Sequence, residues 1–204
     1  MYIPKFNLAT DRDEIVSFMQ RFSFATIISS KNDIPVATHL PFIVTIRDDQ
    51  VVLTSHFAKA NEQWKDLEGN KPLVIFSEPH AYISTSNYDK ELNVPTWNYI
   101  SVHAYGKAQL LTEPAEAMKV INSTIEAFEQ SYGKQWDSFP DEYKSKMLHG
   151  IVAFEVVVDD LQGKKKLSQN RSESEKDKII QALSHSNDMN EKVIASYMLS
   201  DKSK

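Results

Sequence analysis

The sequence predicts a mainly β protein: an antiparallel barrel or strongly curled sheet with inserted helices and helices at its ends. Runs rich in β-branched and aromatic residues alternate with short turn-like stretches such as 31–35 and 47–50. Links this short join antiparallel neighbours, because parallel strands need a much longer crossover. The 204 residues are 41% hydrophobic and 25% charged, which suits one domain with a sizeable core.

The helices are predicted from caps and from apolar residues at helical spacing. Thr10 or Asp11 can accept the free N–H groups of a first helix, and Pro140 opens a shorter one. Gly133 stands where the C-cap of the longest helix is expected. Helices are therefore expected over 10–22, 113–133, 139–150, 172–186 and 187–200, with a short one near 59–67.

The strands are predicted from β-branching and alternation. Gly106 lies inside the longest run and indicates a bulge or a close approach of another backbone. Residues 164–171 are interpreted as a basic polar connector. Strands are expected over 24–30, 36–44, 51–55, 71–77, 80–86, 96–111 and 151–163.

Composition excludes several classes of protein. The net charge of −5 gives no help in approaching a polyanion, and residues 151–204 carry equal numbers of basic and acidic side chains. The chain has no cysteine, so disulfides, thiolate metal sites and cysteine nucleophiles are impossible. No H-E-x-x-H or G-x-S-x-G motif occurs, and we expect no metal ligands and no catalytic triad.

The ends of the chain predict its location. The first residues lack a basic segment followed by an apolar run, as a signal peptide would have. No apolar run approaches the roughly 18 residues of a membrane span. We therefore expect a soluble cytoplasmic protein.

Polar side chains gather at residues 55–64, where a strand gives way to a predicted helix. Thr54, Ser55, Lys59 and the free N–H groups of a helix N-terminus could together bind a phosphate. The alternative is that Ser55 caps the helix and Lys59 is a solvated charge. No glycine-rich phosphate loop is present, so spacing leaves both interpretations open.

Three further groups of residues have alternative interpretations. The strand histidines His39 and His103 could be ligands or hydrogen-bonded structural residues. Trp97 and Tyr105 could be core residues or could line a planar ligand whose polar edge meets Asn98. Residues 164–171 could be a solvated loop, an anion-binding segment or a DNA contact.

Six ordered motifs resemble the PaiB family of FMN-binding proteins, which are described as negative transcriptional regulators. They are MYIPKF, HLPF, HFAKANEQW, EPHAYIS, VPTWNYISVHAYG and GKKKLSQNR, and they span residues 1–171. The family usually has arginine where Lys59 stands between two alanines. A lysine keeps the charge but loses the bidentate fork.

The resemblance implies a split β-barrel with inserted and C-terminal helices, and a homodimer that binds FMN between its subunits. Residues 1–171 would form the FMN-binding domain, and residues 172–204 a helical extension packed on it. HLPF would run along the flavin, Thr54, Ser55 and Lys59 would meet the phosphate, and the partner would supply part of VPTWNYISVHAYG. The residues implied to bind FMN are His39, Leu40, Thr54, Ser55, His56, Lys59, Asn61, Trp97, Asn98, His103, Tyr105, Ser168, Gln169 and Arg171.

The resemblance leaves three functions open. One is a repressor of the PaiB type, for which the acidic charge gives direct DNA binding little support. The second is an FMN-dependent oxidoreductase, similar to flavin reductases, in which His103 or Tyr105 would handle protons. The third is a carrier of flavin or of a haem-like ligand without turnover.

Overall fold

The computed structural model describes residues 1–202, which form two compact units. The first unit contains Met1–Ile15, Ser77–Val102 and the chain from Gln162 onward. The second contains Val16–Phe76 and His103–Leu161. Two long strands, β8 (Thr96–Leu111) and β9 (Ile151–Lys166), each contribute residues to both units.

The strands form one sheet in the order β3-β2-β6-β8-β9-β5-β4, with β1 paired to β9 and β7 paired to β8. Neighbouring strands run antiparallel wherever the register is defined. The predicted class, mainly β with added helices, is confirmed. The other strands are β1 (Leu8–Ala9), β2 (Phe24–Lys31), β3 (Ile34–Pro41), β4 (Ile43–Arg47), β5 (Gln50–Ala58), β6 (Leu73–Phe76) and β7 (His80–Ile83).

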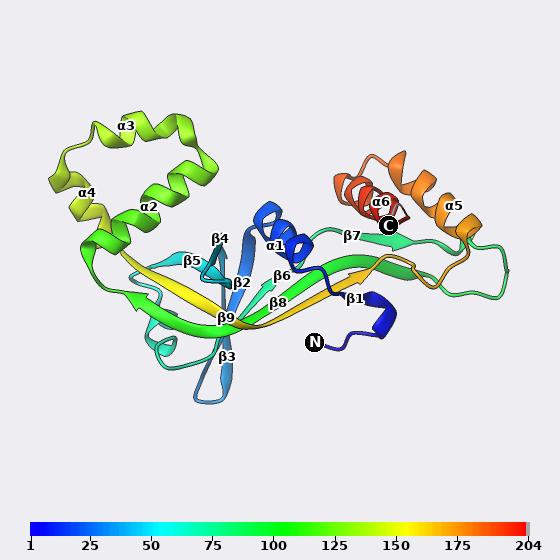
Figure 1. Cartoon of the computed structure of the whole chain (residues 1–204), viewed down its shortest axis with the longest axis horizontal. Helices are drawn as coiled ribbons and strands as arrows, with labels where there is room; N and C mark the ends of the chain where they lie inside the picture. The colour runs from blue at the N-terminus through cyan, green and yellow to red at the C-terminus, as the bar shows by residue number, and fades with distance from the viewer. Residues whose placement is uncertain (203–204) are drawn as a thin grey trace. The chain divides into compact units, whose positions relative to one another are not determined.

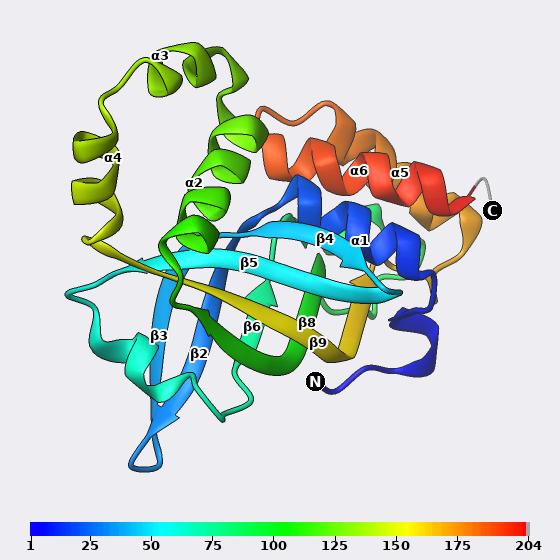
Figure 2. The ribbon, with the colours of Figure 1, turned by 60° about the vertical axis from the view of Figure 1, so that its left-hand side comes forward.

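Two hairpins of the second unit turn where the sequence predicts, and Figure 2 shows each pair of strands side by side. Asn32 and Asp33 have φ of 51° and 62°, as the tight turn between β2 and β3 requires. The predicted strand over 36–44 is wrong in one respect, because the chain divides it at Phe42 into β3 and β4. The Phe42 N–H donates to the carbonyl of Ser23 at 2.8 Å instead of to a strand ladder.

Four phenylalanine rings form the centre of the second unit. Phe42 meets Phe76 and Phe154 edge-on, with centroids 6.0 and 6.1 Å away, and Phe57 stacks on Phe154 at 4.9 Å. All four are almost fully buried. Gly106 approaches this unit's backbone as predicted: a Cβ there would lie 2.2 Å from the Val157 carbonyl oxygen.

Three helices form an arch between β8 and β9 (Figure 1). Trp136 fastens the arch, because its indole N–H donates to Asn122 Oδ1 at 2.9 Å. The prediction that Gly133 caps a single long helix is wrong, because α2 ends five residues earlier and Gly133 begins α3 with a helical φ of −52°. The helices are α2 (Pro114–Phe128), α3 (Gly133–Asp137) and α4 (Asp141–Leu148).

The first unit contains the two closing helices, α5 (Glu173–Ser184) and α6 (Met189–Lys202), which lie side by side in Figure 1. A capping box opens α5, since Ser172 accepts from the Glu175 N–H and Glu175 accepts in return. The N-terminal helix α1 (Arg12–Arg21) divides between the units. Position 171, the predicted domain boundary, falls within the first unit.

Strand β9 continues three residues past the predicted end. The interpretation of residues 164–166 as a connector is therefore wrong, and the connector begins only at Leu167. Pairing of Leu8 with Lys164 and of Ala9 with Gly163 extends the strand. No helix within residues 1–202 is both long enough and apolar enough to span a membrane.

Candidate functional site

The residues predicted to bind FMN divide between the two units. Those of the second unit come from β3, β5, the segment after β5, and β8. Those of the first unit come from β8 and from the segment after β9. The second-unit group is His39, Leu40, Thr54, Ser55, His56, Lys59, Asn61, His103 and Tyr105, and the first-unit group is Trp97, Asn98, Ser168, Gln169 and Arg171.

Hydrogen bonds join three segments of the second unit into one place, which we call the motif corner and define as residues 38–41, 54–56 and 59–63. Ser55 Oγ donates to the Pro41 carbonyl at 2.6 Å, which fastens β5 to the end of β3. Asn61 Nδ2 donates to Thr38 Oγ1 at 2.9 Å, and Thr38 Oγ1 donates to Gln63 Oε1 at 2.6 Å. Segments distant in sequence therefore meet at one place.

The helix at this corner begins later than predicted. Strand β5 continues to Ala58, which pairs with Ile151, and the short 3-10 helix Glu62–Asp66 follows. The cap is Asn61, whose side chain accepts from the Gln63 N–H. The interpretation of Ser55 as the helix cap is therefore wrong, because Ser55 is 3% exposed and points to the inner side of β5.

Thr54 and His56 point away from the side that buries Ser55, because successive strand residues face opposite ways. Thr54 Oγ1 donates to Glu155 Oε1 at 3.4 Å, and Arg47 holds the same carboxylate with bonds of 3.2 and 2.7 Å. Burial lowers the pKa of His56, so its imidazole is neutral at pH 7.

Lys59 is exposed, and its ammonium group makes no ion pair with any described residue. Its backbone is fixed, since the N–H donates to the Gly150 carbonyl at 2.8 Å and the carbonyl accepts from Trp64 Nε1 at 3.1 Å. His39 is also exposed and stacks on Phe24, with ring centroids 6.4 Å apart. Leu40 is half-buried.

His103 and Tyr105 lie on one face of β8, with ring centroids 6.5 Å apart. His103 Nδ1 is buried and has no hydrogen-bond partner within the described residues. Burial lowers the pKa of His103, which keeps the ring neutral at pH 7. A neutral ring with one free nitrogen can accept or donate one hydrogen bond to a ligand.

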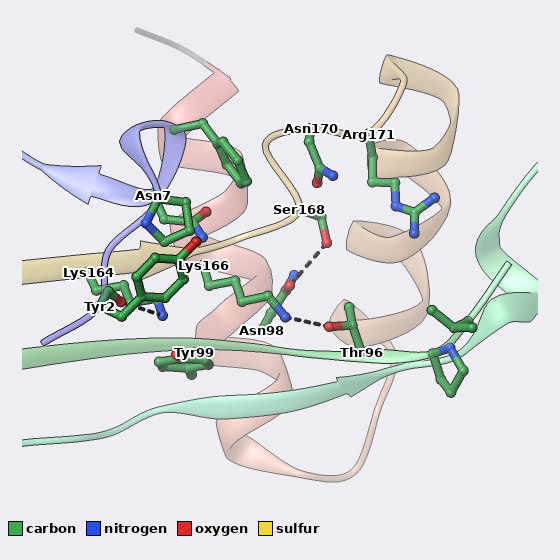
Figure 3. Close-up of a pocket in the computed structure, with 14 residues that line it drawn as sticks. Tyr2, Asn7, Thr96, Asn98, Tyr99, Lys164, Lys166, Ser168, Asn170 and Arg171 are labelled. Atoms are coloured by element: carbon green, nitrogen blue, oxygen red, sulfur yellow. Dashed lines mark hydrogen bonds between the residues drawn. The ribbon is translucent and has the colours of Figure 1, made fainter.

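The first unit contains a second site, the lysine pocket, a cavity of about 460 Å³ (Figure 3). Lys164 is 9% exposed; its Nζ donates to the Tyr2 carbonyl at 3.2 Å and lies 5.2 Å from the centre of the Tyr99 ring. Lys166 Nζ donates to Thr96 Oγ1 and to the Trp97 carbonyl. The described lining residues are Tyr2, Pro4, Phe6, Asn7, Val94, Pro95, Thr96, Asn98, Tyr99, Lys164, Lys166, Ser168, Asn170 and Arg171.

Most predicted residues of the first unit have internal partners. Ser168 Oγ donates to Asn98 Oδ1 at 3.0 Å, and Gln169 Nε2 donates to the Lys165 carbonyl at 2.6 Å. Arg171 donates to an Asn93 side chain at 2.8 Å. These bonds shape the segment after β9.

Trp97 and Arg171, two of the residues predicted to bind FMN, contact aromatic rings in different places. Trp97 is 51% exposed and contacts the rings of His80 and Tyr82, with centroids 5.8 and 5.6 Å away. It is not among the residues that line the lysine pocket. Arg171 does line the pocket, and its guanidinium lies 3.7 Å from the centre of the Tyr88 ring.

The individual residues predicted to bind a ligand did not include Tyr2, Asn7, Tyr99, Lys164 or Lys166, although the segment 164–171 was one candidate for binding an anion. The sequence contained part of the information needed to find the two lysines. Once 164–166 is assigned to a strand, alternation places Lys164 and Lys166 on one face and Lys165 on the other.

Comparisons with known proteins decide the family. The family described as "Putative FMN-binding domain" matches residues 1–160. "Protease synthase and sporulation protein PAI 2" of Bacillus subtilis is 41% identical over 201 residues, covering 97% of this chain and 96% of that protein. The chain belongs to the PaiB family of FMN-binding proteins. The resemblance seen in the six motifs is thereby confirmed, and so, at the level of the family, is FMN as the cofactor.

Solved structures of similar fold support the fold class. The flavocytochrome Anf3 of Azotobacter vinelandii has a TM-score of 0.63 at 16% identity, covering 80% of this chain and 72% of that one. The FAD and heme binding protein of Mycobacterium smegmatis has a TM-score of 0.61 at 15% identity, covering 78% and 73%. The predicted split-barrel fold is confirmed; at these identities the likeness concerns the fold alone.

The predicted residues of the second unit fit a flavin mononucleotide. An unpaired ammonium at Lys59 suits a phosphate, and the buried, unpartnered Nδ1 of His103 suits a polar edge of a ring. Ser55 does not join this donor set, because its hydroxyl is already bonded to Pro41. Among the predicted residues of the second unit, the groups left free are the Lys59 ammonium, imidazoles and the Tyr105 phenol.

Proposed function

We propose that the protein binds FMN at the motif corner, within a homodimer, and that it regulates gene expression in the manner of PaiB. The observation that carries the proposal is the pair of bonds Ser55–Pro41 and Asn61–Thr38. They bring two family motifs, HLPF and HFAKANEQW, together with the end of β5, while leaving the Lys59 ammonium without a carboxylate. Bonds within the protein hold this corner in place, and the Lys59 ammonium is a cation with which an anion can pair.

Each residue has a role in this proposal. Lys59 pairs with the phosphate, and Thr54 and His56 line the face of β5 beside it. His39 and Leu40 lie along the flavin. His103 is neutral and offers Nδ1 for a hydrogen bond, with Tyr105 beside it. When bound, FMN supplies one- and two-electron redox chemistry, and the protein supplies position and electrostatics.

The homodimer is proposed to complete this site. Trp97, Asn98 and the segment containing Ser168, Gln169 and Arg171 belong to the first unit, and we assign them to the partner's contribution. The exposed ring cluster of Trp97, Tyr82 and His80 offers apolar surface for a second copy.

The regulatory role follows the Bacillus relative, whose name refers to protease synthesis and sporulation. A net charge of −5 opposes tight, direct binding to a duplex, because affinity for DNA rests on neutralised phosphates. We therefore propose regulation through a partner or through the flavin's chemistry. A salt-sensitive gel shift with duplex DNA at low salt would contradict the indirect route.

An FMN-dependent oxidoreductase is the second candidate, and the unpartnered Nδ1 of His103 favours it. A hydrogen-bonding group beside a flavin can hold a proton while the flavin changes its redox state. Bleaching of the flavin bands by NADH or NADPH without oxygen would support this function. Full retention of the bands would exclude these two reductants.

Purification tests the proposal as a whole. We expect a yellow protein with flavin absorption bands, one FMN per chain after reconstitution, and a mass by light scattering twice that of one chain. A colourless protein with no saturable FMN binding would overturn the cofactor site. A protein that is monomeric in solution and still binds one FMN per chain would contradict the proposal that a homodimer completes the site.

A further inference from the structure

Three consecutive lysines at the end of β9 have very different surroundings. Lys165 meets two carboxylates, with Nζ 2.6 Å from Glu14 Oε1 and 2.5 Å from Asp201 Oδ1. Lys164 and Lys166 point to the opposite face and meet no carboxylate of the described chain. Two carboxylates of the first unit therefore neutralise the half-buried Lys165, whereas the charges of Lys164 and Lys166 have no carboxylate partner within the described chain.

The lysine pocket is lined by these charges and by one buried side-chain oxygen that has no hydrogen-bond partner within the described residues. Among its described lining residues there is no Asp or Glu, while Lys164, Lys166 and Arg171 are all present. Asn7 is 3% exposed, and its Oδ1 has no hydrogen-bond partner in residues 1–202. A buried amide oxygen without a hydrogen-bond partner is rare in a folded protein, so Asn7 Oδ1 indicates a polar group that a ligand could satisfy.

The walls of the pocket are aromatic. The rings of Tyr2 and Tyr99 lie 5.9 and 5.2 Å from Lys164 Nζ, one on the N-terminal segment and one on β8 (Figure 3). Phe6 and Pro95 also line the cavity. A flat ring can stack against such walls while a charged group meets the lysines.

Electrostatics supports an anionic ligand. Burial, together with the charge of Lys164, lowers the pKa of Lys166. An anion placed between the two ammonium groups would relieve their repulsion and would favour the charged form of Lys166.

We propose that the lysine pocket binds a small organic anion, a carboxylate or a phosphate, that carries a flat ring. Asn98, Ser168 and Arg171 line this pocket and are also assigned to FMN, whereas Lys164, Lys166, Asn7, Tyr2 and Tyr99 are not. The site goes beyond FMN binding because the two lysines, the free amide oxygen and both tyrosine rings lie outside the FMN assignment. The anion is a second ligand, either the molecule that meets the flavin or one that regulates the protein.

Titration calorimetry on the FMN-saturated protein tests the site, with benzoate and phenyl phosphate as probes and inorganic phosphate as the probe without a ring. We expect saturable binding of at least one ring-bearing probe, at least tenfold tighter than inorganic phosphate. The better probe identifies the anionic group. Absence of saturable binding by both ring-bearing probes would overturn the proposal. Equal affinity for inorganic phosphate would contradict the part of the proposal that requires a flat ring in the ligand.

Variants separate this pocket from the FMN site. Lys166→Met keeps the length of the side chain and should weaken the probe at least tenfold, with FMN affinity unchanged. Asn7→Asp places a carboxylate in the pocket and should have the same effect if Lys166→Met fails to fold. Lys107→Met, which removes an exposed charge on β8, is the control and should change neither affinity.

Two results of the variant series decide against the site. If Lys166→Met weakens FMN as strongly as it weakens the probe, the pocket belongs to FMN and not to a second ligand. If neither Lys166→Met nor Asn7→Asp alters probe binding, the probe lies elsewhere. A wild-type protein that binds the probe but no FMN would contradict the proposed function and leave this pocket supported.

Discussion

Replacing Ser55 with alanine separates two roles for this hydroxyl. Its Oγ donates to the Pro41 carbonyl at 2.6 Å, and the residue is 3% exposed. Alanine would leave the carbonyl of the half-buried Pro41 without this donor, which costs about 1–3 kcal/mol in the free energy of unfolding. We expect Ser55→Ala to lose stability of this size, because the bond fastens β5 to the end of β3.

Urea denaturation measures this change, with the midpoint and the slope both recorded. Thr54→Val is the matched control: Thr54 is the neighbouring residue, and its hydroxyl makes only a 3.4 Å contact with Glu155. We expect Thr54→Val to change stability by less than about 0.5 kcal/mol. The motif resemblance instead implies that Ser55 contacts the phosphate directly. Unchanged stability of Ser55→Ala together with a large loss of FMN affinity would refute the structural role of this hydroxyl.

Three further predictions concern backbone packing, pH and helix capping. Gly106→Ala should destabilise the protein by about 1–3 kcal/mol or more in the same assay, because its Cβ would lie 2.2 Å from the Val157 carbonyl oxygen; a neutral effect would contradict the close approach. Burial lowers the folded pKa of His103 below its unfolded value of about 6.5, so its contribution to stability is present above that pH and is lost as pH falls through the folded pKa. His103→Gln should therefore flatten the decline of the unfolding free energy below about pH 6.5, and an unaltered profile would contradict this. Ser172→Ala should cost about 1 kcal/mol, measured by thermal unfolding, because it removes the cap that accepts from the Glu175 N–H, and an unshifted melting temperature would count against the capping box.

Strand positions followed from local sequence where turn chemistry was strong. Strand β8 begins and ends at the predicted residues, and the turns at Asn32–Asp33 and Asp48–Asp49 both have positive φ. Such turns are favoured by Asn and Asp wherever they occur, so the signal is local. The division of the strand predicted over 36–44 at Phe42 had no local signal, because it depends on a bond to Ser23, which lies nineteen positions earlier, just before β2.

The site was predictable only as a set of motifs. Sequence identified the segments of the motif corner, but their meeting depends on bonds such as Asn61–Thr38 between residues far apart in the chain. The sequence could not show whether the Ser55 hydroxyl holds β5 to the end of β3 or binds the phosphate, since both roles need a hydroxyl. Lys164 and Lys166 were predicted only as part of a basic connector with three possible roles, because the pairing with β1 that makes these residues a strand has no local signal.

The affinity of FMN for the Lys59→Ala variant, measured by quenching of flavin fluorescence, tests the central claim most directly. Lys65→Ala removes the same charge six residues away, where Lys65 pairs with Glu62 on the surface, and serves as control. Loss of a charge-assisted bond of about 1.5–3 kcal/mol should weaken binding at least about tenfold in Lys59→Ala. Lys65→Ala should bind like the wild type. Equal affinity of wild type and Lys59→Ala would contradict the assignment of the phosphate to this corner.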